Sequence, residues 1–221
     1  YHRKKQYDLK QKIKFQGNQI NLLQAQMNPH FIFNALNDII RNDRTKNELN
    51  QHIINLSELM RTTLDLGRYE YISVKKVIDY IRKYIDFENK IESIKIVCNF
   101  QEDFNFNEDK IEIPTMVTQP IIENCLKHAF SEDKKDPKIN IQFQKEDNYL
   151  QIIVRDNGIG YDPEVAQKNK TSQAIAILKE RIHTWNSLLK TRRYKIDIQK
   201  VYSPEIGTEV TLHIPYKKRL I

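Results

Sequence analysis

The sequence of 221 residues is poor in cysteine and lacks long apolar runs, internal repeats and low-complexity segments. Its only cysteines, Cys98 and Cys125, have neither the spacing of a metal site nor the density of a disulfide scaffold. No apolar run approaches the roughly 20 residues that cross a bilayer, and no signal-peptide pattern begins the chain. These absences favour a globular chain with reduced thiols, and a hydrophobic content of 39% is enough for a real core.

The net charge of +7 is concentrated at the two ends of the chain. Residues 1–14 hold six Lys and Arg against one acid, and residues 190–221 hold eight against three. The ends therefore carry +10 together and the middle carries −3, which argues against a nucleic-acid surface across the folded part. The chain starts at Tyr1, and a basic cluster at residues 2–5 is typical of the cytoplasmic side of a membrane helix. We therefore expect it to be cut from a longer membrane protein.

Residues 4–42 have the apolar pattern of one long helix with a kink at Pro29. A proline removes a backbone donor and kinks a helix, so the buried face rotates there. His30 and Asn34 are then left on one polar face, offered to solvent. The apolar residues that define the two faces are Ile13, Ile20 and Met27 before the proline, and Ile32, Leu36 and Ile39 after it.

A second helix is predicted to end at Gly67, with one apolar face formed by Leu49, Ile53, Leu56, Met60 and Leu64. Two helices joined by the polar turn at residues 42–47 make a hairpin with little core of its own. Pairing two hairpins into a four-helix bundle would bury both apolar faces, so residues 1–68 predict a dimerisation hairpin and a homodimer. The alternative is that the hairpin packs onto the domain that follows it.

Residues 69–221 combine helices and strands into a second domain. Helices are predicted over residues 74–91, 113–130 and 173–189, and strands over residues 94–100, 138–145, 149–155, 194–201 and 209–214. Because the elements are grouped and do not strictly alternate, this domain is predicted to be an α/β sandwich with a mixed sheet. The whole chain is then of the α+β class.

Three segments of this second domain carry chemistry. Residues 156–160, Asp-Asn-Gly-Ile-Gly, directly follow a strand, and their glycines permit close approach of a ligand. Glu123 and Asn124 stand together in an otherwise apolar helix, so one of them is expected to face the sheet or a cavity. Gly207 and Thr208 open a strand. The alternative for the first segment is an ordinary Asp-Asn-Gly turn.

Residues 23–34, Leu-Gln-Ala-Gln-Met-Asn-Pro-His-Phe-Ile-Phe-Asn, closely resemble the phosphoacceptor box of LytS-type sensor histidine kinases. This resemblance implies that His30 accepts phosphate, with Asn34 as a second catalytic residue. Histidine kinases of the commoner kind have an acidic residue directly after the histidine, where this chain has Phe31. The group that takes the imidazole proton is therefore left open.

The other three segments resemble the N, D and G boxes of the GHKL ATP-binding fold shared by gyrases, chaperones, histidine kinases and MutL. By this resemblance the domain binds ATP with Mg²⁺, Asn124 gives its carbonyl oxygen to the metal, and Asp156 accepts the adenine amino group. Lys127 is the expected phosphate contact near Asn124. The full set of ATP-binding residues implied in this way is Asn124, Lys127, His128, Asp156, Gly158, Gly160, Gly207 and Thr208.

Taken together, the resemblance implies the cytoplasmic region of a two-component sensor histidine kinase in a bacterial inner membrane. It would autophosphorylate on His30 and pass the phosphoryl group to an aspartate of a response-regulator receiver domain, under control of an upstream membrane sensor segment. One alternative is a GHKL ATPase clamp, but such enzymes carry a glutamate where this chain has Pro120, four residues before Asn124. The other is a non-catalytic dimeric scaffold, since Ser172 and Ala174 replace glycines that the family has after the lid.

Overall fold

The computed structural model describes residues 46–91, 95–101, 106–131, 133–162, 173–188 and 193–218. The chain divides into two compact units, Tyr1–Tyr69 and Glu70–Ile221. The predicted kink at Pro29, the predicted catalytic residues His30 and Asn34, and the predicted dimeric bundle all lie outside the described residues or need a second chain.

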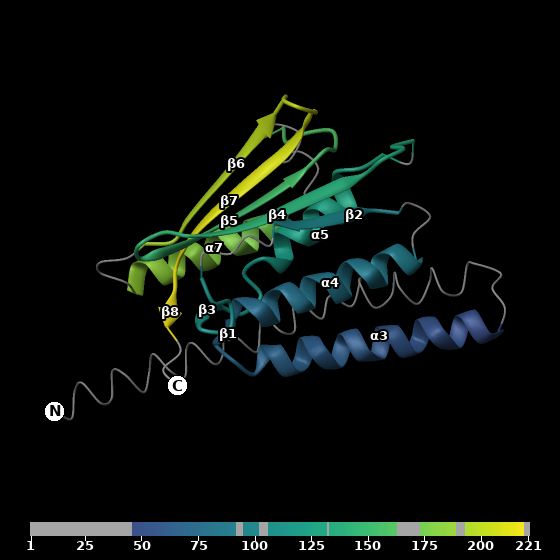
Figure 1. The fold of residues 1–221 in the computed structure, drawn as a ribbon, viewed down its shortest axis with the longest axis horizontal. Coiled ribbons are helices and arrows are strands. Elements are labelled where there is room, and N and C mark those ends of the chain that lie inside the picture. The colour runs from purple at the N-terminus through teal and green to yellow at the C-terminus, as the bar shows by residue number, and fades with distance from the viewer. Residues whose placement is uncertain are drawn as a thin grey trace. The chain divides into compact units, whose positions relative to one another are not determined.

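The described part of the first unit is helix α3, Lys46–Gly67, which ends at the predicted glycine (Figure 1). Of the predicted apolar face, Leu56 is buried within the chain, whereas Ile53 is 44% exposed and Leu64 is 40% exposed. The buried positions are spaced by three and four residues, as on one side of a helix: His52, Leu56, Leu59, Thr63 and Leu66. In the part of the chain that the structure describes, an apolar stripe through Ile53 and Leu64 is therefore exposed on α3. No described helix has the length and apolar character needed to cross a membrane.

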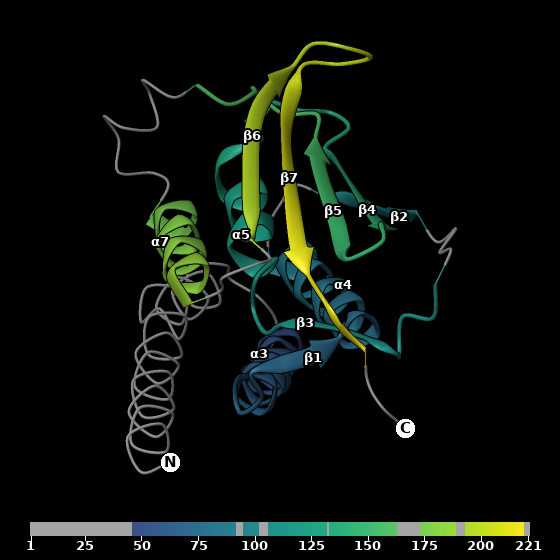
Figure 2. The ribbon, with the colours of Figure 1, turned by 90° about the vertical axis from the view of Figure 1, so that its left-hand side faces the viewer.

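The second unit is built on a five-stranded sheet with the strand order β2-β4-β5-β7-β6 (Figure 2). Strands β2 and β4 pair in parallel, and every other pair in this sheet is antiparallel, so the prediction of a mixed sheet is confirmed. The strands are β2 (Val97–Gln101), β4 (Lys138–Lys145), β5 (Tyr149–Asp156), β6 (Lys195–Val201) and β7 (Gly207–Pro215).

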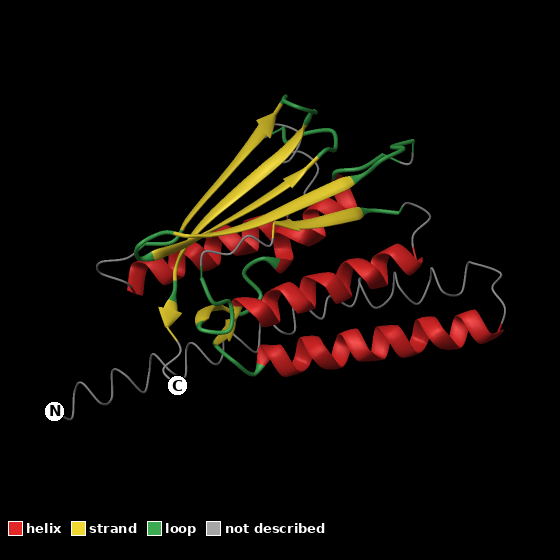
Figure 3. Cartoon of the chain, in the orientation of Figure 1, coloured by secondary structure: helices red, strands yellow, loops and turns green. Residues whose placement is uncertain are grey.

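Helices α4 (Val74–Ile91), α5 (Gln119–His128) and α7 (Gln173–Leu188) lie on one side of this sheet (Figures 1 and 3). Alternate strand residues turn toward them, as the period of two requires. The fully buried side chains include Ile139, Ile141, Leu150, Ile152 and Leu212. The core of this unit is therefore the layer between the sheet and the three helices.

A small second sheet has the order β1-β3-β8, formed by Tyr71–Ser73, Ile111–Pro114 and Lys217–Lys218. The prediction that a helix begins at residue 113 is wrong. Ile111 and Ile113 are both buried and alternate as strand residues, Ile113 pairing with β1 and Ile111 with β8, and Met116, with φ of +59°, then turns the chain. Helix α5 begins only after Thr118, with Pro120 in its first turn, where the missing N–H of a proline costs no helix bond.

Candidate functional site

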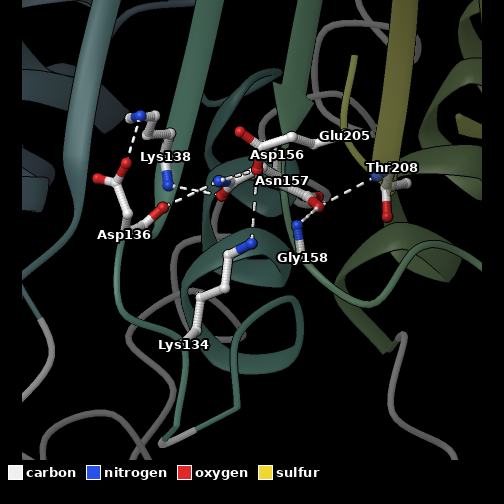
Figure 4. Close-up of polar contacts among 8 residues, drawn as sticks. All are labelled: Lys134, Asp136, Lys138, Asp156, Asn157, Gly158, Glu205 and Thr208. Atoms are coloured by element: carbon white, nitrogen blue, oxygen red, sulfur yellow. Dashed lines mark hydrogen bonds and ion pairs between the residues drawn. The ribbon is translucent and has the colours of Figure 1, made fainter. Parts of the chain in front are cut away.

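Asp156 is the last residue of β5, and its side chain is only 3% exposed. Its Oδ1 atom accepts hydrogen bonds from the backbone N–H groups of Gly158, at 2.9 Å, and of Thr208, at 3.0 Å (Figure 4). Its Oδ2 atom accepts a weak bond from the Cys125 thiol of α5, with Sγ at 3.7 Å. Strand β5, its own loop, the start of β7 and α5 therefore meet at one carboxylate.

The register of the large sheet explains why these segments meet. Arg155 of β5 lies opposite Glu209 of β7, so the next residue on β5 and the preceding residue on β7 are Asp156 and Thr208. Burial raises the pKa of Asp156 above its usual value, and this effect outweighs the lowering by its N–H and thiol donors. The carboxylate oxygens accept hydrogen bonds and would repel an anion. The site is therefore suited to an uncharged group that donates a hydrogen bond.

Glycine is required at two places around Asp156 because backbones pack directly against each other. A Cβ atom added to Gly158 would lie 2.1 Å from the carbonyl oxygen of Ala129, and one added to Gly207 would lie 1.8 Å from the carbonyl oxygen of Asp156. The same Ala129 carbonyl, just past the end of α5, accepts a bond from the Ile159 N–H at 2.9 Å. The end of α5 is thus fixed to the loop that follows β5.

Helix α5 carries the other predicted site residues. Asn124 is half-buried, while Lys127 and His128 are exposed in the last turn. Because they follow Asn124 by three and four residues, all three lie on one face of the helix. Burial, with a smaller effect of Lys127, lowers the pKa of His128 below its usual value. Cys125 points about 100° away from Asn124, toward Asp156.

Sequence reasoning missed three polar contributors to this site, namely Cys125, Asn157 and Glu205. Cys125 was expected only to be a reduced thiol in an apolar setting; it is free and buried, and it also touches Asp156. Asn157 is buried and donates to Glu205 Oε2 at 2.8 Å. The Asp-Asn-Gly pattern signals a turn residue at Asn157, but no local pattern points to Glu205.

Some predicted features lie outside the described residues. Among them are His30, Asn34 and Ser172, whereas Ala174 is half-buried in the first turn of α7. Gly160 is described and has a φ of +83°. Within the described part of the chain, no three His, Cys, Asp or Glu side chains are grouped so that they could hold a metal ion.

Two family models match the sequence in tandem. The family described as "Histidine kinase" matches residues 18–92, and the family described as "Histidine kinase-, DNA gyrase B-, and HSP90-like ATPase" matches residues 110–218. The chain therefore belongs to the sensor histidine kinases, as its motifs predicted, and its second region belongs to an ATP-binding family.

Within that family the chain is similar to the sensor protein LytS of Streptococcus mutans, at 30% identity over 213 residues, which cover 90% of this chain and 34% of that protein. It is also 30% identical to the sensor histidine kinase YpdA of Escherichia coli over 207 residues, which cover 90% of this chain and 34% of that protein. The chain thus spans about a third of the length of these curated relatives. Among solved structures, the histidine kinase domain of the Erythrobacter litoralis blue-light activated histidine kinase aligns with a TM-score of 0.46 and 16% identity, covering 79% of this chain and 77% of that chain.

Proposed function

We propose that this chain is the transmitter region of a two-component sensor, with a phosphoacceptor hairpin at residues 1–68 and an ATP-binding catalytic domain at residues 69–221. It binds ATP, transfers the γ-phosphoryl group to His30, and passes that group to an aspartate of a response-regulator receiver domain. The observation that carries the proposal is the meeting of three motif segments, distant in sequence, at the buried carboxylate of Asp156.

Asp156 is proposed to recognise the adenine base. Two backbone N–H groups occupy Oδ1, and the thiol bond on Oδ2 is weak, so Oδ2 is the atom that accepts from an exocyclic amino group. Guanine presents a carbonyl oxygen where adenine presents this amino group. Two acceptors would then face each other in a buried place, which costs much more than the loss of one neutral bond.

The phosphate end of the site is proposed to lie along the face of α5 that carries Asn124, Lys127 and His128. The amide oxygen of Asn124 is a hard, neutral ligand that fits Mg²⁺, an ion that keeps several waters and takes phosphate oxygens as ligands. When bound, the ion neutralises charge on the phosphates. Lys127 is exposed on the same face and adds a positive charge that attracts the phosphate oxygens.

In the transfer step, an imidazole nitrogen of His30 attacks the γ-phosphorus. The bond from that phosphorus to the β–γ bridging oxygen breaks, ADP leaves, and the ring proton is released. Asn34, four residues later, lies on the same helical face in the predicted kinked helix. In the second transfer, the phosphorus–nitrogen bond breaks as a receiver aspartate oxygen bonds to phosphorus. Pro120 offers no base to activate water, which supports transfer over hydrolysis.

We further propose that two copies pair through the hairpins and that the chain is the cytoplasmic part of an inner-membrane sensor. The uncovered stripe through Ile53 and Leu64 on α3 supports the pairing, because a second copy would bury it. The relatives named sensor proteins are about three times as long as the matched region, which leaves room for a sensor segment of the same protein.

Incubation with γ-labelled ATP tests this function. The chain should acquire label that is stable to base and lost in acid, as a phosphoimidazole is. His30→Gln should abolish the label and leave ATP binding intact, whereas His183→Gln, which changes an exposed histidine of α7, should keep it. Full label on the His30 variant would refute the acceptor assignment. A wild-type chain that binds no ATP would indicate a scaffold, and steady phosphate release by the His30 variant would indicate an ATPase.

A further inference from the structure

The loop between β6 and β7, residues 202–206, is attached to the end of β5 at two points. The Arg155 guanidinium donates to the Ser203 carbonyl oxygen. The Asn157 amide donates to Glu205 Oε2 at 2.8 Å (Figure 4). Just beyond Glu205, Gly207 packs on the Asp156 carbonyl and the Thr208 N–H bonds Asp156 Oδ1. Four residues of one hairpin thus touch residues 155–157.

Asn157 is the buried centre of this attachment. Its Oδ1 atom accepts from the Lys138 N–H at 2.7 Å, and its Nδ2 atom donates to the Asp136 carbonyl oxygen at 2.9 Å as well as to Glu205. An amide nitrogen has two donor hydrogens, so both are used, and the amide oxygen is bonded as well. An aspartate here would turn a carboxylate toward two acceptors. The position therefore needs an amide.

Glu205 also pairs with Lys134, whose Nζ lies 3.6 Å from Oε2. The Lys134 side chain is 31% exposed and the Glu205 side chain is 53% exposed, so this ion pair adds little to stability. The bond to buried Asn157 is different, because its loss would leave an amide donor without a partner inside the protein. The Asn157 bond, followed by Lys134, lowers the pKa of Glu205, so Glu205 is a carboxylate that accepts near neutral pH.

We propose that Glu205 is a positioning residue of the nucleotide site, acting through Asn157. The pair, called here the loop clasp, keeps the start of β7 against the end of β5 and so keeps the Thr208 N–H on Asp156 Oδ1. With both backbone donors in place, the carboxylate cannot rotate, and Oδ2 stays aimed at the base. This inference rests on the proposed role of Asp156 in binding adenine.

The experiment compares Glu205→Ala with Glu205→Gln in the full chain. Glutamine keeps an oxygen that accepts from Asn157 but removes the charge that faces Lys134. We expect Glu205→Ala to weaken ATP binding by about tenfold, or about 1.4 kcal/mol, and Glu205→Gln to bind like the wild type. The matched control is Glu146→Ala, which removes a glutamate from the β4–β5 hairpin, where its carboxylate lies 3.9 Å from His213 Nδ1 at the other end of β5.

Amide hydrogen exchange of the nucleotide-free chain gives a second readout. The Thr208 N–H should lose protection in Glu205→Ala and keep it in Glu205→Gln and Glu146→Ala, with melting temperatures of the two alanine variants alike. Unchanged ATP binding in Glu205→Ala would overturn the inference, and so would equal weakening in Glu205→Gln, which would assign the effect to charge. If the wild-type chain binds no ATP, the proposed function fails, and the exchange readout still decides whether the loop clasp holds Thr208.

Discussion

Asp156 lies in a place that disfavours the charged form of its side chain. Its carboxylate is buried, and the backbone donors, the Cys125 thiol and the Thr208 side chain that contact it do not fully replace water, so its pKa is raised. The ionised form only accepts hydrogen bonds and so selects an amino group, whereas a protonated carboxyl also has a hydroxyl that can donate to the ligand. Base selectivity is therefore linked to the protonation of one side chain.

We expect the preference for ATP over GTP to fall as the pH is lowered and Asp156 becomes protonated. Because the pKa of Asp156 is raised, this fall should occur at a higher pH than for an ordinary aspartate, whose pKa is 3.8. Protonation increases as pH falls, and the protonated acid offers a donor that guanine can accept. Calorimetric titrations with both nucleotides across the acid range measure the ratio, in which titration of the phosphates cancels. Asp156→Asn should show a low ratio at every pH. A pH-dependent ratio in that variant would assign the titration to another group.

At the scale of elements, Arg181 of α7 connects this helix to the turn that precedes α5. Arg181 donates to the Thr115 and Met116 carbonyl oxygens, at 3.0 and 3.2 Å, and its guanidinium lies 4.7 Å from the ring centre of Trp185. Burial lowers its pKa to about 10, so it remains charged at neutral pH. It therefore braces the turn in which Met116 adopts a positive φ, just before the helix that carries Asn124.

Arg181→Met should cost about 2–3 kcal/mol of unfolding free energy, because it keeps apolar volume but leaves two inward carbonyl oxygens without their donor. Arg181→Lys should recover part of the loss, since one ammonium replaces a planar group that serves both carbonyls and stacks on Trp185. Denaturant unfolding measures both variants. Equal stability of the methionine variant and the wild type would show that water or another donor satisfies the turn.

For the whole molecule, the uncovered apolar residues of α3 bear on assembly. Ile53 and Leu64 lie eleven residues apart, three turns along one face, and each exposes over a third of its surface. A stripe of this kind, on a helix that already buries a neighbouring face, is what a second hairpin would cover.

We expect Ile53→Glu combined with Leu64→Glu to convert a dimer to a monomer, because two charges per chain would be desolvated in the interface. Sedimentation measures the mass, and ATP binding by the second unit should be unchanged. Val97→Glu is the matched control, since Val97 on the edge strand β2 is 47% exposed. A dimer that persists in the double variant would place the interface elsewhere.

Much of the second unit could be predicted because its signals are local. Helix α4 and strand β4 have the predicted bounds, and β5 is one residue longer than predicted. The apolar period marks these elements, and turn residues mark the ends of the strands. Strands β1 and β8 were missed because elements of three and two residues are too short for a period and form only through pairing with β3. The predicted apolar face of α3 is only partly buried within the chain, with Leu56 buried and Ile53 and Leu64 exposed, and its burial by a second hairpin stays a prediction.

The candidate site also contains residues that the sequence predicts and residues that it does not. Asp156, Gly158 and Thr208 stand in short motifs whose chemistry is visible in the sequence, and their contacts join residues brought together by sheet register. The contact of Asn157 with Glu205 spans 48 residues and depends on how a hairpin loop bends. A contact that depends on a distant loop has no signal in the sequence on either side of the residue.

The attachment of residues 203, 205, 207 and 208 to the end of β5 also restricts length. Hairpin loops at a sheet end are usually the places where a chain accepts extra residues or a fused tag. Here one residue added between Glu205 and Gly207 would shift Glu205 relative to Thr208, and the two could no longer both reach residues 156 and 157. A peptide inserted at this point of the turn would therefore disturb base recognition while leaving the β6–β7 pairing in register.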